Sequence, residues 1–331
     1  MKENDIKVTV FIPTYNGEQY LPEIFRTVFT QKVNFDYEVL VIDSGSSDST
    51  LTIVTQCQKD HPNLRLHKIP NTEFGHGKTR NLAAQLARGE YVVYITHDAI
   101  PAHDRWLYEI TRPFEVNKNI VGVMGKQIPR PNCIPMLKSE IRAVFGGFGP
   151  DFGTTLFYKD DFIQDQGTYD AVSFYSDANS AARKQYLTDQ VPYKDVSYAE
   201  DQLFGRDIID AGYYKAYAPR ASVIHSNDLT LKEYRRRMFD ETLGLRKIGL
   251  TVAVPSYRTV AKLITRGIAR DVRNIARDKE YSFRRKIYWQ IVNPLFHVQR
   301  WRGVRKGARV DVNDTGIIAK YSLEDNRKNN S

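Results

Sequence analysis

The stretch Val8-Thr9-Val10-Phe11-Ile12-Pro13-Thr14-Tyr15-Asn16-Gly17 decides the fold, because a short apolar run ends there in a polar turn. An uninterrupted apolar run of this kind is typical of a strand buried on both faces. The residues that follow carry apolar side chains at helical spacing, namely Leu21, Ile24, Phe25 and Val28. The sequence therefore predicts a strand over 8–12, a polar turn, and a helix over 17–31.

The same alternation continues through the first half of the chain. We expect further strands over 37–42, 64–69, 91–95 and 120–124, separated by helices over 49–59, 78–88 and 104–116. Strands that alternate with helices pair in parallel and form a sheet covered on both faces. Ligands of such sheets bind beyond the carboxyl ends of the strands. Three polar clusters fall there, over 14–17, 43–48 and 96–99.

The second half is less regular. Residues 126–176 are rich in glycine, proline and aromatic side chains, and their apolar pattern is weak. We expect a short helix near 135–145 and then variable strands. Beyond this segment the pattern predicts helices over 181–187 and 199–212, a strand near 221–225, and helices from 229 onward. The polar residues 322–331 are expected to fray.

The composition is that of a folded globular protein, with 331 residues of which 41% are hydrophobic and 26% charged. At about 150 residues per domain, this length predicts about two units. No apolar run reaches the ~18 residues of a membrane span, and the N-terminus lacks the pattern of a secretion signal. Cys57 and Cys133 are too few for a disulfide scaffold or a four-thiolate zinc site. We therefore expect a protein of the reducing cytoplasm.

Positive charge is concentrated in one C-terminal segment. Residues 232–309 contain 21 Lys and Arg against 6 Asp and Glu, a net charge of +15, whereas the whole chain carries +9. Such a segment suggests a polyanionic partner, either nucleic acid or an anionic membrane surface. Because the segment has no zinc pattern, no RNA-binding aromatic motif and no helix-turn-helix signature, we expect no nucleic-acid partner.

Residues 256–309 have the pattern of helices that lie in a membrane surface. From Tyr257 the apolar residues form one helical stripe, and arginine and lysine occupy the other faces. The stripe consists of Val260, Leu263, Ile264, Ile268, Val272 and Ile275. A second apolar and basic stretch follows over 283–301, in which Pro294 is expected to kink or divide the helix. The alternative is that the stripe packs on the rest of the protein or on a second subunit. The membrane hypothesis predicts that residues 1–255 stay folded when 256–309 are deleted.

Five short motifs occur in order along the chain, at Pro13–Gly17, Asp43–Asp48, Phe74–Asn81, Thr96–Pro101 and Ala199–Asp201. Together, over roughly residues 6–240, they resemble family-2 glycosyltransferases of the GT-A fold, which make glycosidic bonds from nucleotide-activated sugars. The form Phe-Gly-His-Gly-x-Thr-Arg-Asn followed by Thr-x-Asp-Ala resembles bacterial rhamnosyltransferases of cell-surface polysaccharide synthesis.

The resemblance implies an α/β fold with a GT-A-type, mostly parallel sheet that binds a nucleotide sugar and is flanked by helices. It places a glycosyltransferase domain at 1–228, with a nucleotide-binding half at about 1–125 and an acceptor half at about 126–228. A basic amphipathic helical region would follow at 229–310, and a polar tail at 311–331.

The resemblance assigns nucleotide contacts to Pro13, Thr14, Tyr15, Asp43, Lys78, Arg80 and His97. A carboxylate such as Asp43, at the end of a strand, can accept the ring N–H of a pyrimidine, and Tyr15 can stack on a flat ring. Lys78 and Arg80 begin a helix, where basic groups and free N–H groups suit a diphosphate. The Gly-His-Gly of residues 75–77 would clear room for that ligand.

The family places Asp-x-Asp at the end of its fourth strand, where a divalent cation neutralises the leaving diphosphate. Here the triplet is Thr96-His97-Asp98, so only the later carboxylate remains. The resemblance implies Mg²⁺ or Mn²⁺ at Asp98, and His225 as a further ligand would favour Mn²⁺. The alternative for His225 is a half-buried structural histidine. His97 either contacts the nucleotide or points into the sheet.

Inverting transfer needs a carboxylate that takes the proton of the acceptor hydroxyl. The resemblance assigns this role to Asp201, and Glu200 would hold the acceptor. Asp177 and Asn179 would contact sugar hydroxyls, or else cap the helix expected after them. Phe148 lies in the glycine-flanked aromatic segment 145–153, which is a candidate acceptor loop.

The leading hypothesis is an inverting transferase that moves L-rhamnose from dTDP-L-rhamnose to a lipid-linked glycan, docked on the inner face of the cell membrane. A UDP-hexose donor is the alternative, because thymine and uracil share the edge that Asp43 would read. A non-catalytic sugar-binding protein is a further alternative, since the metal triplet is eroded, but the intact Glu200-Asp201 pair disfavours it. A homo-oligomer is compatible with the sequence.

Overall fold

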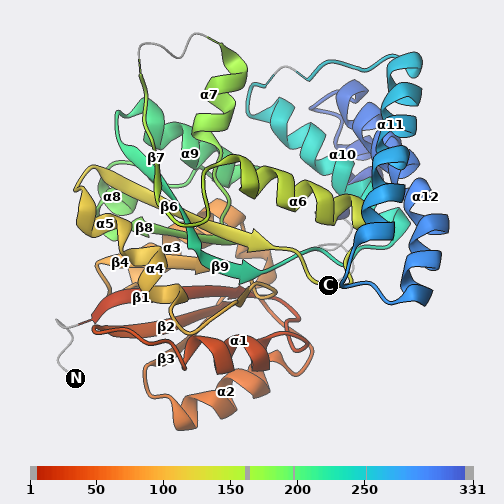
Figure 1. Ribbon diagram of the computed structural model, residues 1–331. Helices are drawn as coiled ribbons and strands as arrows, with labels where there is room; N and C mark the ends of the chain where they lie inside the picture. The colour runs from red at the N-terminus through yellow and green to blue at the C-terminus, as the bar shows by residue number, and fades with distance from the viewer. Residues whose placement is uncertain (1–5, 161–164, 197, 251, 325–331) are drawn as a thin grey trace. The chain divides into compact units, whose positions relative to one another are not determined.

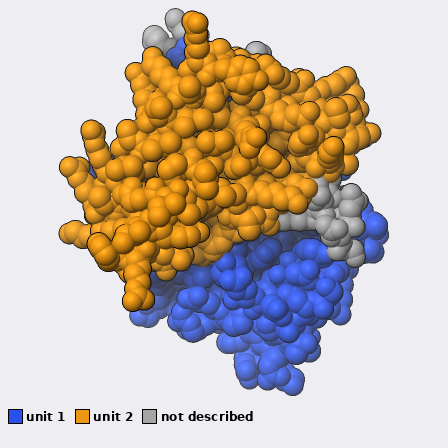
Figure 2. Space-filling view, turned by 90° about the vertical axis from the view of Figure 1, so that its right-hand side faces the viewer, with its two compact units in different colours: residues 1–128, 144–196, 200–225 blue, residues 129–143, 197–199, 226–331 orange. Residues whose placement is uncertain are grey.

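The computed structural model describes residues 6–160, 165–196, 198–250 and 252–324. Contacts between residues divide the chain into two compact units, which are coloured separately in Figure 2. The sheet unit comprises residues 1–128, 144–196 and 200–225, and the helical unit comprises residues 129–143, 197–199 and 226–331. This grouping differs from the expected ranges, because residues 129–143 from the middle of the chain join the C-terminal helices.

The sheet unit is built on one mixed sheet (Figure 1). Its strands are β1 (Ile6–Thr14), β2 (Asp36–Asp43), β3 (Leu64–Lys68), β4 (Tyr91–Ile95), β5 (Ile100–Pro101), β6 (Ile120–Ile128), β7 (Thr155–Phe157), β8 (Asn179–Arg183) and β9 (Tyr214–Ile224). They lie in the order β3-β2-β1-β4-β8-β6-β9-β5, and β7 pairs with β9. The parallel strands expected in the first half are confirmed, because β1 pairs in parallel with both β2 and β4. The carboxyl ends of these three strands therefore meet at one edge of the sheet.

Strand β8 makes the centre of the sheet antiparallel, which the sequence pattern does not predict. It runs opposite to β4 on one side and to β6 on the other. The helix expected over 181–187 is therefore wrong in its first part, because helix α8 (Lys184–Asp189) begins only after β8. Ser180, Ala181 and Ala182 are fully buried in the strand. Packing between two strands thus overrides the helix preference of alanine.

The helices of the sheet unit mostly follow the predicted positions. They are α1 (Leu21–Val28), α2 (Thr50–Asp60), α3 (His76–Leu86), α4 (Trp106–Thr111), α5 (Pro113–Val116), α7 (Gln166–Ser173), α8 and α9 (Glu200–Asp210). Helix α1 begins at Leu21 rather than Gly17, with Pro22 in its first turn, where no N–H is required. The single helix expected over 104–116 is divided into α4 and α5 at Pro113, whose ring lacks the N–H that a continuous helix needs.

The helical unit contains four helices among the described residues of its C-terminal part, in addition to the first part of α6 (Pro135–Gly147). These are α10 (Leu231–Lys247), α11 (Tyr257–Arg277), α12 (Phe283–Arg309) and α13 (Thr315–Tyr321). Side-chain caps from Thr230, Ser256 and Ser282 fix the starts of the three long helices. Helix α12 runs continuously through Pro294, so the expected division there does not occur.

Helices α10 and α12 pack closely because two glycines of α12 face α10. A Cβ at Gly303 would lie 2.3 Å from the carbonyl oxygen of Arg235, and one at Gly307 would lie 2.8 Å from that of Phe239. A core of apolar side chains fills the unit: Ile134, Met136, Tyr234, Met238, Ile275, Tyr281, Trp289 and Phe296. Deleting residues 256–309 would therefore remove the packing partner of α10, contrary to the expectation that residues 1–255 stay intact.

The stripe expected to face a membrane on α11 instead packs partly against α12. Val260 and Ile275 are buried, and between them the carboxylate of Asp271 is fully buried. Asp271 accepts hydrogen bonds from Asn293 (3.0 Å) and pairs with His297 (2.8 Å), both on α12. Leu263 and Val272 of the expected stripe remain exposed on α11. Further exposed apolar residues at helical spacing lie on α12. They are Phe283, Ile287, Ile291, Leu295 and Val298, and we call them the α12 stripe.

The C-terminal segment is ordered further than its polar composition predicts. Ile318 of α13, Ser322 and Leu323 are buried. The backbone N–H of Leu323 donates to the Asp240 carboxylate at 2.7 Å, and that of Glu324 donates to the same oxygen at 3.2 Å. The expected fraying from residue 322 is therefore wrong up to Glu324, and residues 325–331 lie outside the described part. No helix in the described residues is long and apolar enough to span a bilayer.

Candidate active site

The turns after β1 and β2 are joined through the carboxylate of Asp43. Asp43 is only 1% exposed. It accepts hydrogen bonds from the Thr14 hydroxyl (3.1 Å), from the Ser46 hydroxyl (2.5 Å) and from the backbone N–H groups of Gly45 and Ser46 (3.1 Å each). A carboxylate accepts about four hydrogen bonds, so its capacity is used within the turn. The structure therefore gives Asp43 a turn-organising role, and its contact with a pyrimidine stays a prediction.

Asn16 connects the same two turns, a role that our sequence interpretation missed. Its side-chain oxygen accepts a hydrogen bond from the N–H of Ser47 at 2.9 Å, and its own N–H donates to the Ser46 hydroxyl at 2.9 Å. The backbone φ of Asn16 is +50°, a conformation that asparagine adopts more readily than most residues. The Asn-Gly pair after an apolar run was the available signal. Pro13 and Tyr15 beside it are half-buried.

Arg80 of α3 lies in a buried cluster of acidic side chains rather than at an open helix end. Its Nε is 2.9 Å from Asp177, and its Nη1 donates to Glu200. Burial alone would raise the pKa of Glu200, but Arg80 and His76 hold it below its ordinary value. The single positive charge of Arg80 is thus shared by two carboxylates of the protein itself, so the group keeps a net negative charge. Contact of Arg80 with a donor diphosphate stays a prediction.

The glycines before α3 make room for the protein rather than for a ligand. A Cβ at Gly77 would lie 2.2 Å from the carbonyl oxygen of Lys194, and one at Gly75 would lie 3.0 Å from Asp195. The expectation that this Gly-His-Gly segment clears space for a nucleotide is therefore wrong at Gly77. Lys78 next to it is exposed, and its contact with a donor phosphate stays a prediction.

Asp177 and Asn179 are interior residues. Asp177 is 1% exposed and accepts hydrogen bonds from Ser180 (2.6 Å) and Tyr193 (2.9 Å) in addition to its pairing with Arg80. Asn179 is completely buried. Its side chain accepts from Trp106 and donates to the carbonyl groups of Lys126 and Ala221. The expected helix capping is wrong, because the helix that follows has Arg183 at its N-cap. Contact of either side chain with sugar hydroxyls stays a prediction.

Asp201, in the first turn of α9, is the acidic side chain of this cluster with the greatest exposure. It is half-buried, whereas Asp177 and Glu200 are buried. It accepts a hydrogen bond from the N–H of Gln202 at 2.8 Å, and it forms no ion pair within the described part of the chain. Burial, and then the charges of Glu200 and Asp177, raise the pKa of Asp201 well above its ordinary value. A carboxylate with a raised pKa is suited to accept a proton near neutral pH.

Asp98 and His225 are brought together at a second point of the sheet edge. His225 Nε2 lies 3.4 Å from Asp98 Oδ2, and His225 Nδ1 is 2.9 Å from the Gln127 side-chain oxygen. Burial alone would raise the pKa of Asp98, but the adjacent His225 holds it well below its usual range. A histidine whose second nitrogen is held by an oxygen is the arrangement found in metal-binding sites.

Asp98 and His225 fit a divalent cation as a partial ligand set. Ligand atoms this close together can contact one ion at ordinary bond lengths of about 2.0–2.2 Å. Among the residues that the structure describes, there is no cluster of three or more histidine, cysteine or acidic side chains suited to a metal. The remaining ligands would have to come from the donor diphosphate and water. His97 faces the first turn, because a Cβ at Gly17 would lie 3.5 Å from its ring.

Phe148 belongs to an aromatic cluster and is half-buried. Its ring lies 5.0 Å from that of Phe174 and 5.5 Å from that of Tyr217, measured between centroids. Beneath the cluster Lys215 is fully buried, and this burial lowers its pKa to about 7. The exposed aromatic of the expected acceptor loop is Phe152, which is 79% exposed. An acceptor contact by Phe148 stays a prediction.

Comparison with known proteins places the chain in a family. A family model described as "Glycosyl transferase family 2" matches residues 9–189. The chain is 30% identical to the O-antigen chain rhamnosyltransferase RfbN of Salmonella typhimurium over 238 residues, which are 71% of each protein. It is 31% identical to the O-antigen chain rhamnosyltransferase WbaN of Salmonella anatum over 235 residues, which are 70% of each.

Solved structures agree with this assignment at the level of the fold. The crystal structure of an S. aureus TarS fragment matches with a TM-score of 0.50 and 18% identity, over 92% of this chain and 90% of that one. The structure of GalNAc-T7 matches with a TM-score of 0.52 and 14% identity, over 84% of this chain and 58% of that one. The GT-A-like α/β architecture expected from the sequence is confirmed. The chain belongs to glycosyl transferase family 2 and is a glycosyltransferase.

Proposed function

We propose that this enzyme transfers L-rhamnose from dTDP-L-rhamnose to a lipid-linked glycan during synthesis of a cell-surface polysaccharide. Two relatives that match over about two thirds of the chain are O-antigen chain rhamnosyltransferases. The observation that carries the proposal is the setting of Asp201. This carboxylate is half-buried, has a raised pKa and lies beside two carboxylates that share the single charge of Arg80.

Asp201 would act as the base of an inverting displacement. Its carboxylate takes the proton from an acceptor hydroxyl as that oxygen attacks the anomeric carbon of rhamnose. The bond between the anomeric carbon and the diphosphate oxygen breaks on the opposite face, and dTDP leaves with the bonding electrons. Attack on the face opposite to the leaving group inverts the anomeric configuration. The ion pairs of Arg80 with Asp177 and Glu200 would hold the first turn of α9 in place.

Asp98 and His225 would hold the divalent cation, and Gln127 would orient the His225 ring. When bound, the cation neutralises the charge that develops on the leaving diphosphate. Lys78 is the exposed basic residue of the 74–81 motif and would contact the same phosphates, because Arg80 is occupied by acidic side chains. Both contacts are part of the proposal.

Tyr15 and the turn organised by Asp43 would bind the nucleotide base. Thymine and uracil present the same N–H and carbonyl groups to this edge, so a UDP-hexose remains the second candidate donor. Thymidine and uridine nucleotides differ in the base methyl group and the 2′-hydroxyl, and no residue described above discriminates either group.

We also propose that the helical unit docks on an anionic membrane surface, although not through the stripe expected on α11. The α12 stripe is exposed, with Phe283 at 78% and Ile291 at 69%. Arg284 and Arg285 lie beside it and are exposed as well. Exposed apolar side chains next to cations are the chemistry of interfacial binding, at about 1 kcal/mol per cation near an anionic surface.

A donor panel tests the proposed reaction. The purified enzyme is incubated with dTDP-L-rhamnose, UDP-glucose or GDP-mannose, Mn²⁺ and lipid-linked saccharide, and the products are analysed by mass spectrometry and NMR. We expect a deoxyhexose addition from dTDP-L-rhamnose only, with the anomeric configuration inverted. Transfer from UDP-glucose alone would replace the donor assignment, and retention of configuration would overturn the role of Asp201.

Cosedimentation with liposomes tests the docking surface. Replacing Phe283 and Ile291 by serine should abolish binding to anionic vesicles and leave the thermal unfolding temperature unchanged. Val116→Ser is the matched control, because Val116 is 73% exposed and lies in the sheet unit. Unchanged binding of the α12 double variant would refute the docking surface.

A further inference from the structure

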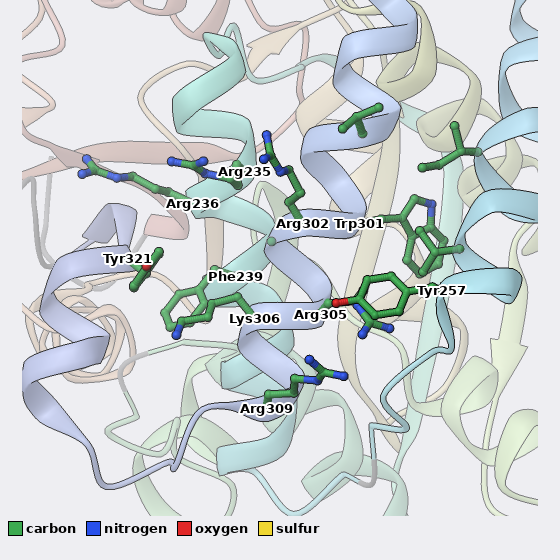
Figure 3. A pocket seen from close by; sticks show the side chains of 14 residues that line it. Arg235, Arg236, Phe239, Tyr257, Trp301, Arg302, Arg305, Lys306, Arg309 and Tyr321 are labelled. Atoms are coloured by element: carbon green, nitrogen blue, oxygen red, sulfur yellow. The ribbon is translucent and has the colours of Figure 1, made fainter.

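The helical unit contains a cavity of about 460 Å³ whose lining carries a dense group of cations (Figure 3). Helices α10, α11, α12 and α13 all contribute to it. Six of the lining residues are basic: Arg235, Arg236, Arg302, Arg305, Lys306 and Arg309. No Asp or Glu lines the cavity within the described residues. We call this feature the cationic cavity.

Among the residues that the structure describes, no carboxylate pairs with the charges of the cationic cavity. The Nε of Arg235 is buried and has no hydrogen-bond partner. Arg305 donates to the Pro255 carbonyl and lies 3.8 Å from the centre of the Tyr257 ring. The hydrogen bond from Arg305, with the charges of Arg305 and Arg309, lowers the pKa of Tyr257.

Cations held this closely repel one another unless an anion lies among them. Five of the six are arginines, whose planar guanidinium groups bind phosphate oxygens in pairs. The polar side of the cavity therefore matches the chemistry of a phosphate or diphosphate group.

The remaining lining residues, apart from Gly303, are apolar or aromatic, and two of the aromatic rings, Tyr257 and Tyr321, lie against the cations Arg305 and Lys306. Val260 and Ile264 come from α11, and Val298 and Trp301 come from α12. Val298 is also the last residue of the α12 stripe, which continues through Leu295, Ile291 and Ile287 at helical spacing. An exposed apolar track thus leads into the cavity. Free phosphate has no apolar group that could contact this track. A phosphorylated lipid would contact both the cations of the cavity and the apolar track.

We propose that the cationic cavity binds the diphosphate head of a polyisoprenoid-type lipid, whose chain lies along the α12 stripe. This inference rests on the proposed function, in which such a lipid carries the saccharide acceptor. The cavity would then anchor the carrier, a role distinct from the chemistry at Asp201. Phosphate and nucleotides share the diphosphate chemistry, so the experiment must separate head group from chain.

Calorimetric titration of the full chain provides that separation, with dTDP present throughout to occupy the donor site. Three probes are compared: farnesyl diphosphate, inorganic diphosphate and farnesol. We expect farnesyl diphosphate to bind more tightly than inorganic diphosphate, and farnesol to bind weakly. Replacing Arg302 and Arg309 by alanine should weaken farnesyl diphosphate binding by about tenfold or more, because two charge-assisted contacts are lost. Both residues are exposed, so the fold should persist.

The matched control replaces Arg273 and Arg277, which are exposed on α11 and do not line the cavity. It removes the same charge and should leave binding unchanged. Equal loss in both double variants would show a general charge effect and overturn the site. Equal affinity for inorganic and farnesyl diphosphate would overturn the lipid assignment and leave a phosphate site.

Transfer assays separate this inference from the proposed function. The Arg302 and Arg309 double variant should transfer rhamnose normally to a soluble saccharide and show a raised KM for the lipid-linked one. A wild-type enzyme that transfers no rhamnose would refute the proposed reaction while leaving the binding measurement intact. An unchanged KM for the lipid-linked acceptor in the double variant would overturn the role of the cavity.

Discussion

The acidic cluster of the sheet unit and the cationic cavity of the helical unit treat charge in opposite ways. In the first, Arg80 is shared by Asp177 and Glu200, and all three side chains are buried. In the second, six cations line one cavity without a described carboxylate. Charges that the protein pairs with one another hold its structure together. Charges that it leaves unpaired mark the places where a proton or a ligand must supply the missing partner.

Asp201 is one of the unpaired charges, although it lies beside the paired charges of Arg80, Asp177 and Glu200. It is adjacent to the Arg80 cluster and takes part in none of its ion pairs, so its carboxylate is destabilised by its neighbours. We therefore expect changes at the paired charges to affect stability and changes at the unpaired charges to affect function.

Removing the unpaired carboxylate should have the largest effect. Asp201→Asn keeps the shape of the side chain and removes the base, which should lower kcat by ~10²–10⁴-fold while dTDP-sugar binding persists. Steady-state kinetics and donor titration measure the two quantities. Asp207→Asn on the same helix is the control, since Asp207 only pairs with Lys194 at the surface. Near-normal turnover of the Asp201 variant would refute its assignment.

Removing the paired cation should affect stability instead. Arg80→Met leaves Asp177 and Glu200 buried without a counter-charge, which should lower the free energy of unfolding by about 3–5 kcal/mol. Lys78→Met, two residues earlier and exposed, should change it by less than about 0.5 kcal/mol. Urea denaturation compares the two. Similar stabilities for both variants would mean that the Arg80 ion pairs do not support the fold.

The Asp98–His225 pair is expected to act on the diphosphate rather than on the base. Asp98→Ala should weaken dTDP binding in the presence of Mn²⁺ by about tenfold or more and leave thymidine binding unchanged. Titration calorimetry with and without EDTA measures both. If EDTA and the substitution leave dTDP binding intact, binding does not need a metal, and Lys78 must supply the positive charge.

The pH dependence of transfer should report the environment of Asp201. A base works when deprotonated, so a raised pKa places the acid limb of kcat/KM at higher pH than an ordinary carboxylate would. Glu200→Gln removes one of the charges that raise this pKa, and the acid limb should move to lower pH by up to about one unit. A limb that stays in place, or moves to higher pH, would assign the titration to another group.

The sequence was sufficient for the elements that repeat a simple pattern. Strands β1, β2, β3 and β4 and the helices between them lie where the apolar pattern predicts, because each is buried through its own local residues. Strand β8 was missed, since Ala181 and Ala182 have no strand preference and are held there only by β4 and β6. The conformation of such an element is determined by the strands that pack beside it, and a single sequence does not show which strands these are.

The candidate site shows the same division. The motifs pointed to Asp201 and Asp98, and a late strand end pointed to His225; the structure brings Asp98 and His225 together. The sequence could not show that Arg80 pairs with Asp177, more than ninety residues later. It also could not show that the Asn179 side chain makes its hydrogen bonds with Trp106 and two backbone carbonyl groups. The sequence also could not show that part of the α11 stripe, at Val260 and Ile275, is buried within the helical unit. An amphipathic pattern predicts which face of a helix is buried, but it does not predict which partner covers that face.

The contact of Asp271 with α12 has a mechanical consequence for the helical unit. Sliding α11 by one turn, about 5.4 Å, would separate Asp271 from Asn293 and His297 and leave it with Arg270, its partner on the same helix. A Cβ at Gly267 would also lie 2.5 Å from the His297 ring, which keeps the two helix axes close. These polar contacts therefore fix the register of α11 against α12. That register keeps Val260 and Ile264 of α11 together with Val298 and Trp301 of α12 in the lining of the cationic cavity.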